Sequence, residues 1–204
     1  MKNKFQIFAE ITKLRITIFV TVTTMFGFIA ATNSISFQIL LPALGILLLA
    51  CGSAALNHYQ ERKTDVLMDR TKNRPIPSGK ISAKSTIQIS FVLVVVGSIL
   101  LFASSGLLAL SLGLLNLIWY NAVYTPLKKV SALAIIPGSL VGAIPPVVGW
   151  VAGGGNILDP QIILISFFSF IWQIPHFWLL LMVLDKDYQK AGFPTLTQIF
   201  SQQQ

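Results

Sequence analysis

Apolar residues occur in six long runs separated by short polar stretches, and this alternation is the dominant pattern of the 204-residue chain. Each run is long enough, or nearly so, to cross the roughly 30 Å hydrocarbon core of a bilayer as a helix. We place these helices at residues 14–32, 38–57, 86–104, 107–123, 132–153 and 162–184. The third and fourth runs are separated only by a Ser-Ser-Gly sequence at 104–106, which predicts a tight reversal. The predicted fold is therefore all-α, a polytopic membrane helix bundle with six transmembrane helices.

The basic residues predict how this bundle is oriented. The chain contains 15 Lys and Arg residues. All of them lie near the start of the first predicted helix, or after the second, the fourth or the sixth. The three connections on the opposite side contain none. Because cytoplasmic loops carry the excess of Lys and Arg, this distribution predicts a cytoplasmic N-terminus.

The composition agrees with a membrane protein and argues against a nucleic-acid-binding one. Hydrophobic residues make up 54% of the chain and charged residues 11%, whereas soluble domains are about a quarter charged. The formal net charge of +8 is confined to short loops and is not gathered on one solvated face, as a nucleic-acid surface would need. The single cysteine, Cys51, lies inside an apolar run and cannot form an intramolecular disulfide. No cleavable signal peptide is indicated.

The polar stretch 57–80 contains three of the seven acidic residues, Glu61, Asp65 and Asp69. With Asn57 they recur every four residues, which on a helix places them along one slowly drifting face. Amide and carboxylate oxygens suit Mg²⁺, so Asn57, Glu61 and Asp65 are candidate metal ligands. Asp69 is a weaker candidate, because prolines follow soon after it and the helix could end first. A helix end emerging into water would also account for these charges.

Basic and aromatic residues accompany this acidic stripe. Arg70 and Arg74 are four residues apart and could face one ligand, and Arg presents a two-pronged fork to phosphate. Tyr124 and Lys128 are also four apart and could place a hydroxyl and an ammonium on one anion. The alternatives are that the loop bases only set the topology and that the tyrosine is an interfacial aromatic. We favour a magnesium–diphosphate site.

Polar residues also follow the last apolar run. His176 lies inside that run, and Asp187 and Tyr188 come soon after it. Eleven residues correspond to three helical turns, so we expect His176 and Asp187 to share one helical face. A histidine at membrane depth is a functional candidate, although a lone one is more often a packed core residue.

A diphosphate site in a membrane protein predicts a lipid-like substrate with a diphosphate head, such as an isoprenyl diphosphate. Metal and bases would stabilise the departing diphosphate. Apolar walls would keep water away from the allylic cation that this departure leaves.

The chain resembles the intramembrane UbiA-type prenyltransferase family, and within it the branch that acts on haem. Asn57, Glu61 and Asp65 match the first motif of this family. The blocks DVLMDRTKNRPIPSG, YTPLKK, GAIPPVVGW, WQIPHFW and DYQKAGFPTL follow in the expected order. The resemblance therefore extends from residue 57 to about residue 197.

This resemblance implies an enzyme that transfers farnesyl from farnesyl diphosphate to a vinyl group of haem b, giving haem O with Mg²⁺ as cofactor. It implies the bacterial inner membrane, an active site facing the cytoplasm, and haem A synthase or terminal oxidase assembly proteins as candidate partners. The implied catalytic residues are Asn57, Glu61, Asp65, Arg70, Arg74 and Lys128. The implied metal ligands are Asn57, Glu61, Asp65 and Asp187. The implied substrate contacts are Tyr124, His176, Asp187 and Tyr188.

Three departures from the family pattern qualify this expectation. Glu61 stands where many relatives have Asp, and the position four before Asp187 is Val183 instead of an acid. Family members usually have nine helices, so we expect residues 1–204 to form a single domain that is incomplete at its C-terminus. Prenyl transfer to an aromatic or quinone precursor such as 4-hydroxybenzoate is an alternative. An ion or lipid transporter is a second alternative, but its acids would more often lie near the bilayer midplane.

Overall fold

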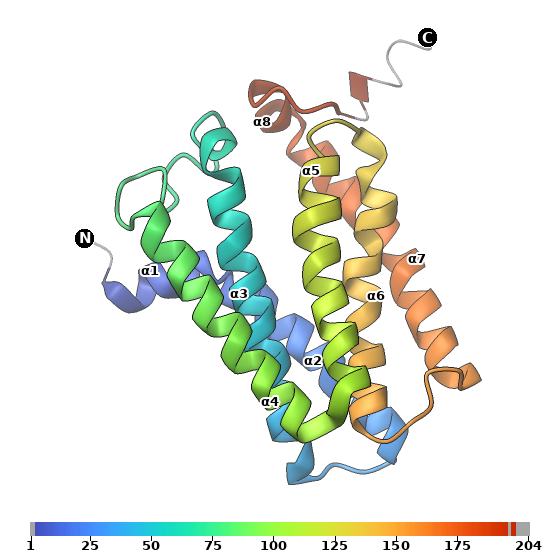
Figure 1. The fold of residues 1–204 in the computed structure, drawn as a ribbon. Coiled ribbons are helices and arrows are strands. Elements are labelled where there is room, and N and C mark those ends of the chain that lie inside the picture. The colour runs from blue at the N-terminus through green and yellow to red at the C-terminus, as the bar shows by residue number, and fades with distance from the viewer. Residues whose placement is uncertain (1–2, 196, 199–204) are drawn as a thin grey trace.

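The computed structural model describes residues 3–195, 197 and 198, and over these residues the secondary structure is entirely helical. Figure 1 shows the helices gathered into one bundle. In chain order they are α1 (Lys4–Ile11), α2 (Leu14–Thr32), η1 (Phe37–Ile39), α3 (Leu40–Asp65), α4 (Ala83–Ile118), η2 (Trp119–Tyr124), α5 (Thr125–Leu127), η3 (Ala132–Ala134), α6 (Ile135–Ala152), α7 (Pro160–Val183) and α8 (Asp185–Lys190). The predicted all-α membrane bundle is confirmed.

Helix α4 consists of two arms that reverse at Gly106, as the sequence predicts. Gly106 has φ 76° and ψ −174°, a conformation that is essentially open only to glycine. The chain doubles back at this point (Figure 1). Five elements among the described residues are long and apolar enough to cross a membrane, and one of them, Ala83–Leu127, includes both arms. The number of crossings and the side of the N-terminus stay predictions.

Helix α3 extends eight residues beyond the predicted end of the second apolar run. It continues to Asp65, because residues 57–65 contain neither Gly nor Pro and include several good helix formers. Asn57, Glu61 and Asp65, which we call the stripe, therefore lie on the last turns of a membrane helix and not on a loop.

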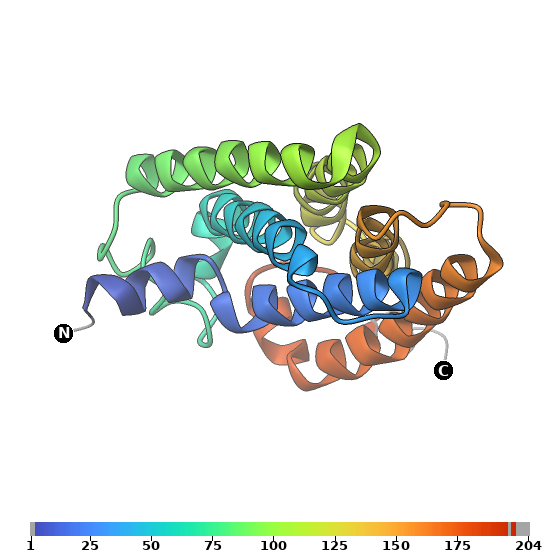
Figure 2. The ribbon, with the colours of Figure 1, turned by 90° about the horizontal axis from the view of Figure 1, so that it is seen from below.

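Close helix contacts hold the bundle together through glycine. A Cβ built on Gly149 of α6 would lie 1.8 Å from the carbonyl oxygen of Thr24 in α2, and one built on Gly97 of α4 would lie 2.8 Å from that of Gly45 in α3. Small residues allow helix backbones to approach in this way in membranes. Figure 2 shows the result, with α3 between α2 and the first arm of α4.

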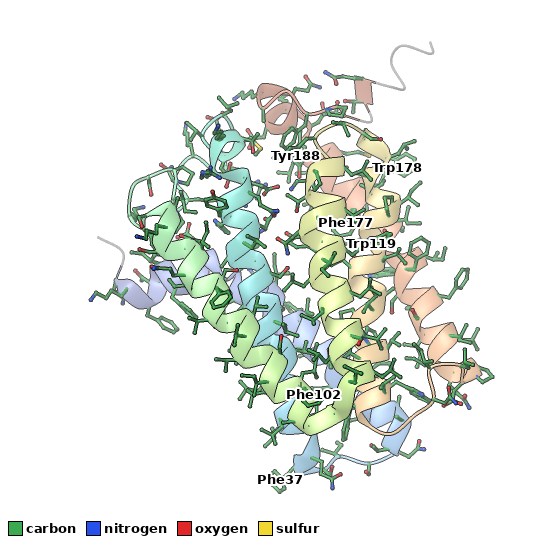
Figure 3. The ribbon with its side chains drawn as sticks, viewed as in Figure 1. Phe37, Phe102, Trp119, Phe177, Trp178 and Tyr188 are labelled. Atoms are coloured by element: carbon green, nitrogen blue, oxygen red, sulfur yellow. The ribbon has the colours of Figure 1, made fainter. Side chains whose placement is uncertain are left out.

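The outer surface of the bundle is apolar, as expected for a protein surrounded by lipid. Large side chains such as Phe19, Phe91 and Phe167 are more than 60% exposed. The labelled side chains mark its two ends, with Phe37 at one end and Tyr188 at the other (Figure 3). The polar cluster described below lies at the Tyr188 end.

Two short helices, α1 and α8, are not predicted from the apolar pattern. Asn3 caps α1 through a reciprocal pair of hydrogen bonds with Gln6. Helix α8 begins after a break at Leu184, where φ is −98° and ψ is 8°. His176 and Asp187 therefore belong to different helices. The expectation that they share one helical face is wrong, because the helix that would align them ends at Val183.

Candidate functional site

The predicted stripe is buried inside the bundle. Asn57, Glu61 and Asp65 are 0%, 4% and 0% exposed. The helix ends at Asp65, so Asp69 falls outside it and is exposed. Buried carboxylates are costly unless they are paired and hydrogen-bonded. The partners of the stripe therefore define the site.

Each residue of the stripe contacts a basic side chain from another segment. Lys13 Nζ donates to Asn57 Oδ1 at 2.6 Å. Arg74 Nη1 donates to both carboxylate oxygens of Asp65, at 2.8 and 2.9 Å, and lies 3.9 Å from Glu61 Oε2. Lys128 forms an ion pair with the Glu61 carboxylate. Three bases, one before α2, one after α3 and one after α5, thus converge on one face of α3.

Lys13 is a site residue that the sequence does not reveal. It sits in the turn between α1 and α2 with φ 48° and ψ 45°, a left-handed conformation that is uncommon for a residue with a side chain. Burial lowers the pKa of Lys13 to about 7, against the opposing influence of the Glu61 carboxylate. Its position at the start of an apolar run suggests only a topology-setting charge, and no spacing rule connects it to Asn57.

Two tyrosines on the neighbouring segment stand beside these bases. The rings of Tyr120 and Tyr124 are stacked 5.8 Å apart. Lys13 Nζ lies 3.2 Å from the Tyr120 hydroxyl, and Lys128 Nζ lies 5.6 Å from the centroid of the Tyr124 ring. Burial favours the neutral amine of Lys128, but the Glu61 carboxylate outweighs it and holds the pKa of Lys128 above its ordinary value. Lys128 is therefore a permanent cation of the site.

Thr125, the first residue of α5, orients the Asn57 amide. Thr125 Oγ1 donates to the carbonyl oxygen of Tyr120 and accepts from Asn57 Nδ2 at 3.0 Å. Because Asn57 Nδ2 is bonded to Thr125, Asn57 Oδ1 faces the other way, toward Lys13. Gln60 Nε2 also donates to the backbone carbonyl of Asn121, at 3.0 Å, which fastens α3 to η2. Element η2 is a π-helix, and such π-turns occur often at functional sites.

The predicted site residues fall into two groups in the structure. Those gathered in the cluster are Asn57, Glu61, Asp65, Arg74, Tyr124 and Lys128. Tyr188 joins them at its edge, since it lines a small cavity of about 20 Å³ with Tyr124 and Lys128. Lys13 and Tyr120 also belong to the cluster, although they are not among the predicted site residues.

Three predicted residues lie outside this cluster. Arg70 is exposed, and its backbone N–H donates to Asp187 Oδ2 at 3.1 Å. His176 is exposed on α7, with its ring 5.8 Å from that of Phe177. The metal role of Asp187 and the substrate roles of Arg70 and His176 stay predictions.

The oxygen donors of the stripe fit a hard divalent cation. Two carboxylates and one amide oxygen occupy one helical face, and Mg²⁺ accepts few protein ligands because it keeps several waters. Among the described residues no group of three His, Cys, Asp or Glu side chains could hold a metal ion. Asn57 would therefore have to supply the third protein oxygen. Arg74 and Lys128 add two positive charges, and Lys13 adds a third in its protonated form. Such a set of cations suits an anion with many oxygens.

The long apolar helices define an integral membrane protein, and one end of its bundle holds a buried set of hard oxygen ligands and bases. Residues 19–204 match the UbiA prenyltransferase family, and the chain belongs to this family.

Several relatives share substantial sequence identity with the chain. One from Oleidesulfovibrio alaskensis is 35% identical over 89% of this chain and 64% of its own length. One from Geobacter sulfurreducens is 42% identical over 75% of this chain and 56% of its own length. One from Cytophaga hutchinsonii is 36% identical over 96% of this chain and 69% of its own length. All three are named protoheme IX farnesyltransferase, and the chain spans little more than half to about two thirds of their lengths.

Two solved structures share the fold. A digeranylgeranylglyceryl phosphate synthase superposes with a TM-score of 0.80 at 17% identity, over 98% of this chain and 70% of its own. A UbiA homologue from Archaeoglobus fulgidus, bound to GPP and Mg²⁺, superposes with a TM-score of 0.73 at 16% identity, over 95% of this chain and 69% of its own.

Proposed function

We propose that the protein transfers the farnesyl group of farnesyl diphosphate to a vinyl group of protohaem IX (haem b), giving haem O. The convergence of Lys13, Arg74 and Lys128 on Asn57, Glu61 and Asp65 carries this proposal. It brings the oxygen ligands that Mg²⁺ prefers and the bases that a diphosphate would need to one place. The choice of haem as acceptor rests on the relatives named protoheme IX farnesyltransferase.

Asn57, Glu61 and Asp65 would hold Mg²⁺ in this site. The Archaeoglobus fulgidus homologue bound to GPP and Mg²⁺ supports this cofactor. When bound, the metal supplies positive charge at the leaving diphosphate. Lys13, Arg74 and Lys128 would then leave the stripe and turn toward phosphate oxygens. Arg70 and Asp187 are further proposed ligands that would have to approach from the loop after α3 and from α8.

The bases make ionisation of the substrate possible. The bond between C1 of farnesyl and the diphosphate oxygen breaks, and its electron pair leaves with the diphosphate. Lys13, Arg74 and Lys128 stabilise the charge that develops on this leaving group. Tyr120 and Tyr124 present aromatic faces, which attract the allylic cation.

The acceptor then completes the reaction. The π electrons of a haem vinyl group attack C1 of the farnesyl cation, and a carbon–carbon bond forms. The cation left on the former vinyl group is captured by water, which loses one proton and becomes the hydroxyl group. The apolar interior of the bundle delays that water until the carbon–carbon bond exists. Tyr124, Tyr188 and His176 are the proposed substrate contacts.

The proposed setting is the bacterial inner membrane, with the N-terminus and the site on the cytoplasmic side. All 15 bases fall on one predicted side of the bundle, which supports this orientation. We further propose six crossings in a single domain over residues 1–204. Haem A synthase and terminal oxidase assembly proteins are the proposed protein partners.

The test is product formation by membranes that contain the protein. They are incubated with Mg²⁺, farnesyl diphosphate and either haem b or 4-hydroxybenzoate, and the products are identified by mass spectrometry. We expect haem O from haem b, and we expect it to disappear in Asp65→Asn. Prenylated 4-hydroxybenzoate without haem O would contradict the choice of acceptor. Mg²⁺-dependent ion flux without any prenylated product would favour the transporter alternative.

A further inference from the structure

Asp69 continues the four-residue spacing of the stripe but has a different environment. Helix α3 ends four residues before it, and its side chain is 55% exposed. Asp69 Oδ1 accepts from Lys72 Nζ at 2.7 Å, and Asp69 Oδ2 pairs with Lys190 Nζ. Lys190 lies on α8, 121 residues further along the chain. Asp69 therefore joins two loops and does not contribute to the metal cluster.

The segment that Asp69 contacts covers part of the site. We call residues 185–195 the strap. Arg70, the residue after Asp69, also binds the strap, since its backbone N–H donates to Asp187 Oδ2 at 3.1 Å. On its inner side, Tyr188 and Pro194 line a small cavity with Tyr124 and Lys128.

The strap also has its own packing. Phe193 is only 4% exposed and its ring lies edge-on to that of Tyr188, 5.4 Å away. The strap is therefore a folded cover and not a loose tail. Its position over the site therefore depends on contacts with the rest of the bundle.

The loop that carries Asp69 provides a fixed attachment point. Thr71 Oγ1 donates to the backbone carbonyl of Asp65 at 2.8 Å, and Met68 is buried. The Arg74 guanidinium holds the other end of this loop on the Asp65 carboxylate. Two neighbouring contacts, at Asp69 and Arg70, thus connect the end of α3 to the strap.

We infer that Asp69 is a positioning residue, which holds the strap over Lys128 and Tyr124 through its ion pair with Lys190. The inference rests on the proposed function of the cluster beneath the strap as a diphosphate site. Asp69 itself contacts no substrate. Lys190 and Lys72 hold the pKa of Asp69 at about 2, so the carboxylate is charged at neutral pH.

The strength of this contact suits a cover that opens. Exposed ion pairs change an equilibrium by no more than about fivefold. A strap held by such a pair can be released for each diphosphate that enters or leaves. The buried pair between Arg74 and Asp65, by contrast, belongs to the fixed part of the site.

A charge swap tests the inference without an assay of prenyl transfer. The variants are Asp69→Lys, Lys190→Asp and the two together, with Lys80→Asp as a matched control on an exposed lysine of the same loop that has no ion pair among the described residues. Spin labels are placed at Lys63→Cys on α3 and Lys186→Cys on the strap. The native Cys51 is buried and stays unlabelled.

The first readout is the distribution of distances between the labels. We expect one narrow distribution in the unmodified protein and in Lys80→Asp, a broader and longer one in each single variant, and recovery in the double swap. Recovery also shows that the single variants had not simply failed to fold. An unchanged distribution in both single variants overturns the inference.

The second readout is the binding of inorganic diphosphate with Mg²⁺. We expect the affinity to fall about fivefold in each single variant and to recover in the double swap. If the label distances change while the affinity for diphosphate does not, the inference that the strap covers the diphosphate site is overturned. If the unmodified protein binds no diphosphate while the label distances still respond, the proposed function fails and the attachment of the strap stands.

Discussion

The ammonium group of Lys13 lies 2.6 Å from Asn57 Oδ1, although 44 residues separate the two in sequence. Asn57 is the first residue of the proposed metal-binding stripe, and the bond from its Nδ2 to Thr125 keeps its Oδ1 facing Lys13. In the proposed mechanism, a divalent cation on Asn57 would repel and displace the protonated lysine. The displaced ammonium would then be available to a phosphate oxygen, and metal binding would be coupled to diphosphate binding.

Lys13→Met should weaken the binding of Mg²⁺–diphosphate. The substitution keeps an apolar stem and removes the charge. Hydrogen bonds to charged groups contribute about 1.5–3 kcal/mol, so we expect a roughly tenfold or larger loss of affinity by isothermal titration calorimetry. Arg15→Met is the matched control, because Arg15 is exposed and has no ion pair among the described residues. An equal loss in both variants would contradict a specific role for Lys13.

Asp65→Asn should destabilise the fold as well as abolish metal binding. Asp65 is 0% exposed and neutralises the Arg74 guanidinium, which is 16% exposed. Removal of one partner from a buried pair costs about 3 kcal/mol or more, and the partial exposure of Arg74 places this case at the lower end. The free energy of unfolding in mixed micelles should fall by about 3 kcal/mol. The double variant Asp65→Asn/Arg74→Met should recover part of the loss, and no recovery would argue against the pair.

Gly149→Ala should disturb the contact between α2 and α6. The added methyl group would meet the backbone oxygen of Thr24 at 1.8 Å, and backbone cannot move aside as a side chain can. Overpacking of this kind costs about 1–3 kcal/mol, visible as a lower melting temperature. Gly113→Ala is the control, since the nearest atoms to its methyl group are the side-chain ends of Leu101, Leu49 and Ile46, at 3.0, 3.1 and 3.5 Å. Similar losses in both variants would contradict the packing argument.

The attachment of the strap should not respond to pH near neutrality. Hydrogen bonds from Lys190 and Lys72 lower the pKa of Asp69 from 3.8 to about 2. A carboxylate whose pKa is lower in the folded state contributes stability that is complete above its unfolded pKa and is lost as the pH falls through the folded value. The label distances between Lys63→Cys and Lys186→Cys should therefore be constant from pH 8 to pH 5. A transition inside that range would show that another group controls the strap.

The parts of the structure that sequence can predict are those with a local cause. The alignment of Asn57, Glu61 and Asp65 on one face of α3 follows from their four-residue spacing in a helix. The reversal at Gly106 follows from a Ser-Ser-Gly break between apolar runs. The long apolar runs predict the bundle because backbone in lipid must satisfy its own hydrogen bonds.

The parts that escape prediction depend on contacts between distant segments. Lys13 reaches Asn57 only through the left-handed turn before α2, and Lys128 reaches Glu61 only because η2 packs against α3. Because the helix breaks at Leu184, Asp187 contacts the backbone of Arg70. Helical spacing alone predicts instead that Asp187 lies on the same face as His176. These arrangements follow from tertiary packing, which no local pattern records.

The most direct test of the central claim is the Mg²⁺ dependence of farnesyl diphosphate binding to the purified protein. Titration calorimetry should show binding in the presence of Mg²⁺ and its loss after chelation of the metal. Glu61→Gln should lose the same binding even with Mg²⁺, while the control Arg15→Met keeps it. Equal binding with and without Mg²⁺, or full binding by Glu61→Gln, would contradict the assignment of this stripe as a magnesium–diphosphate site.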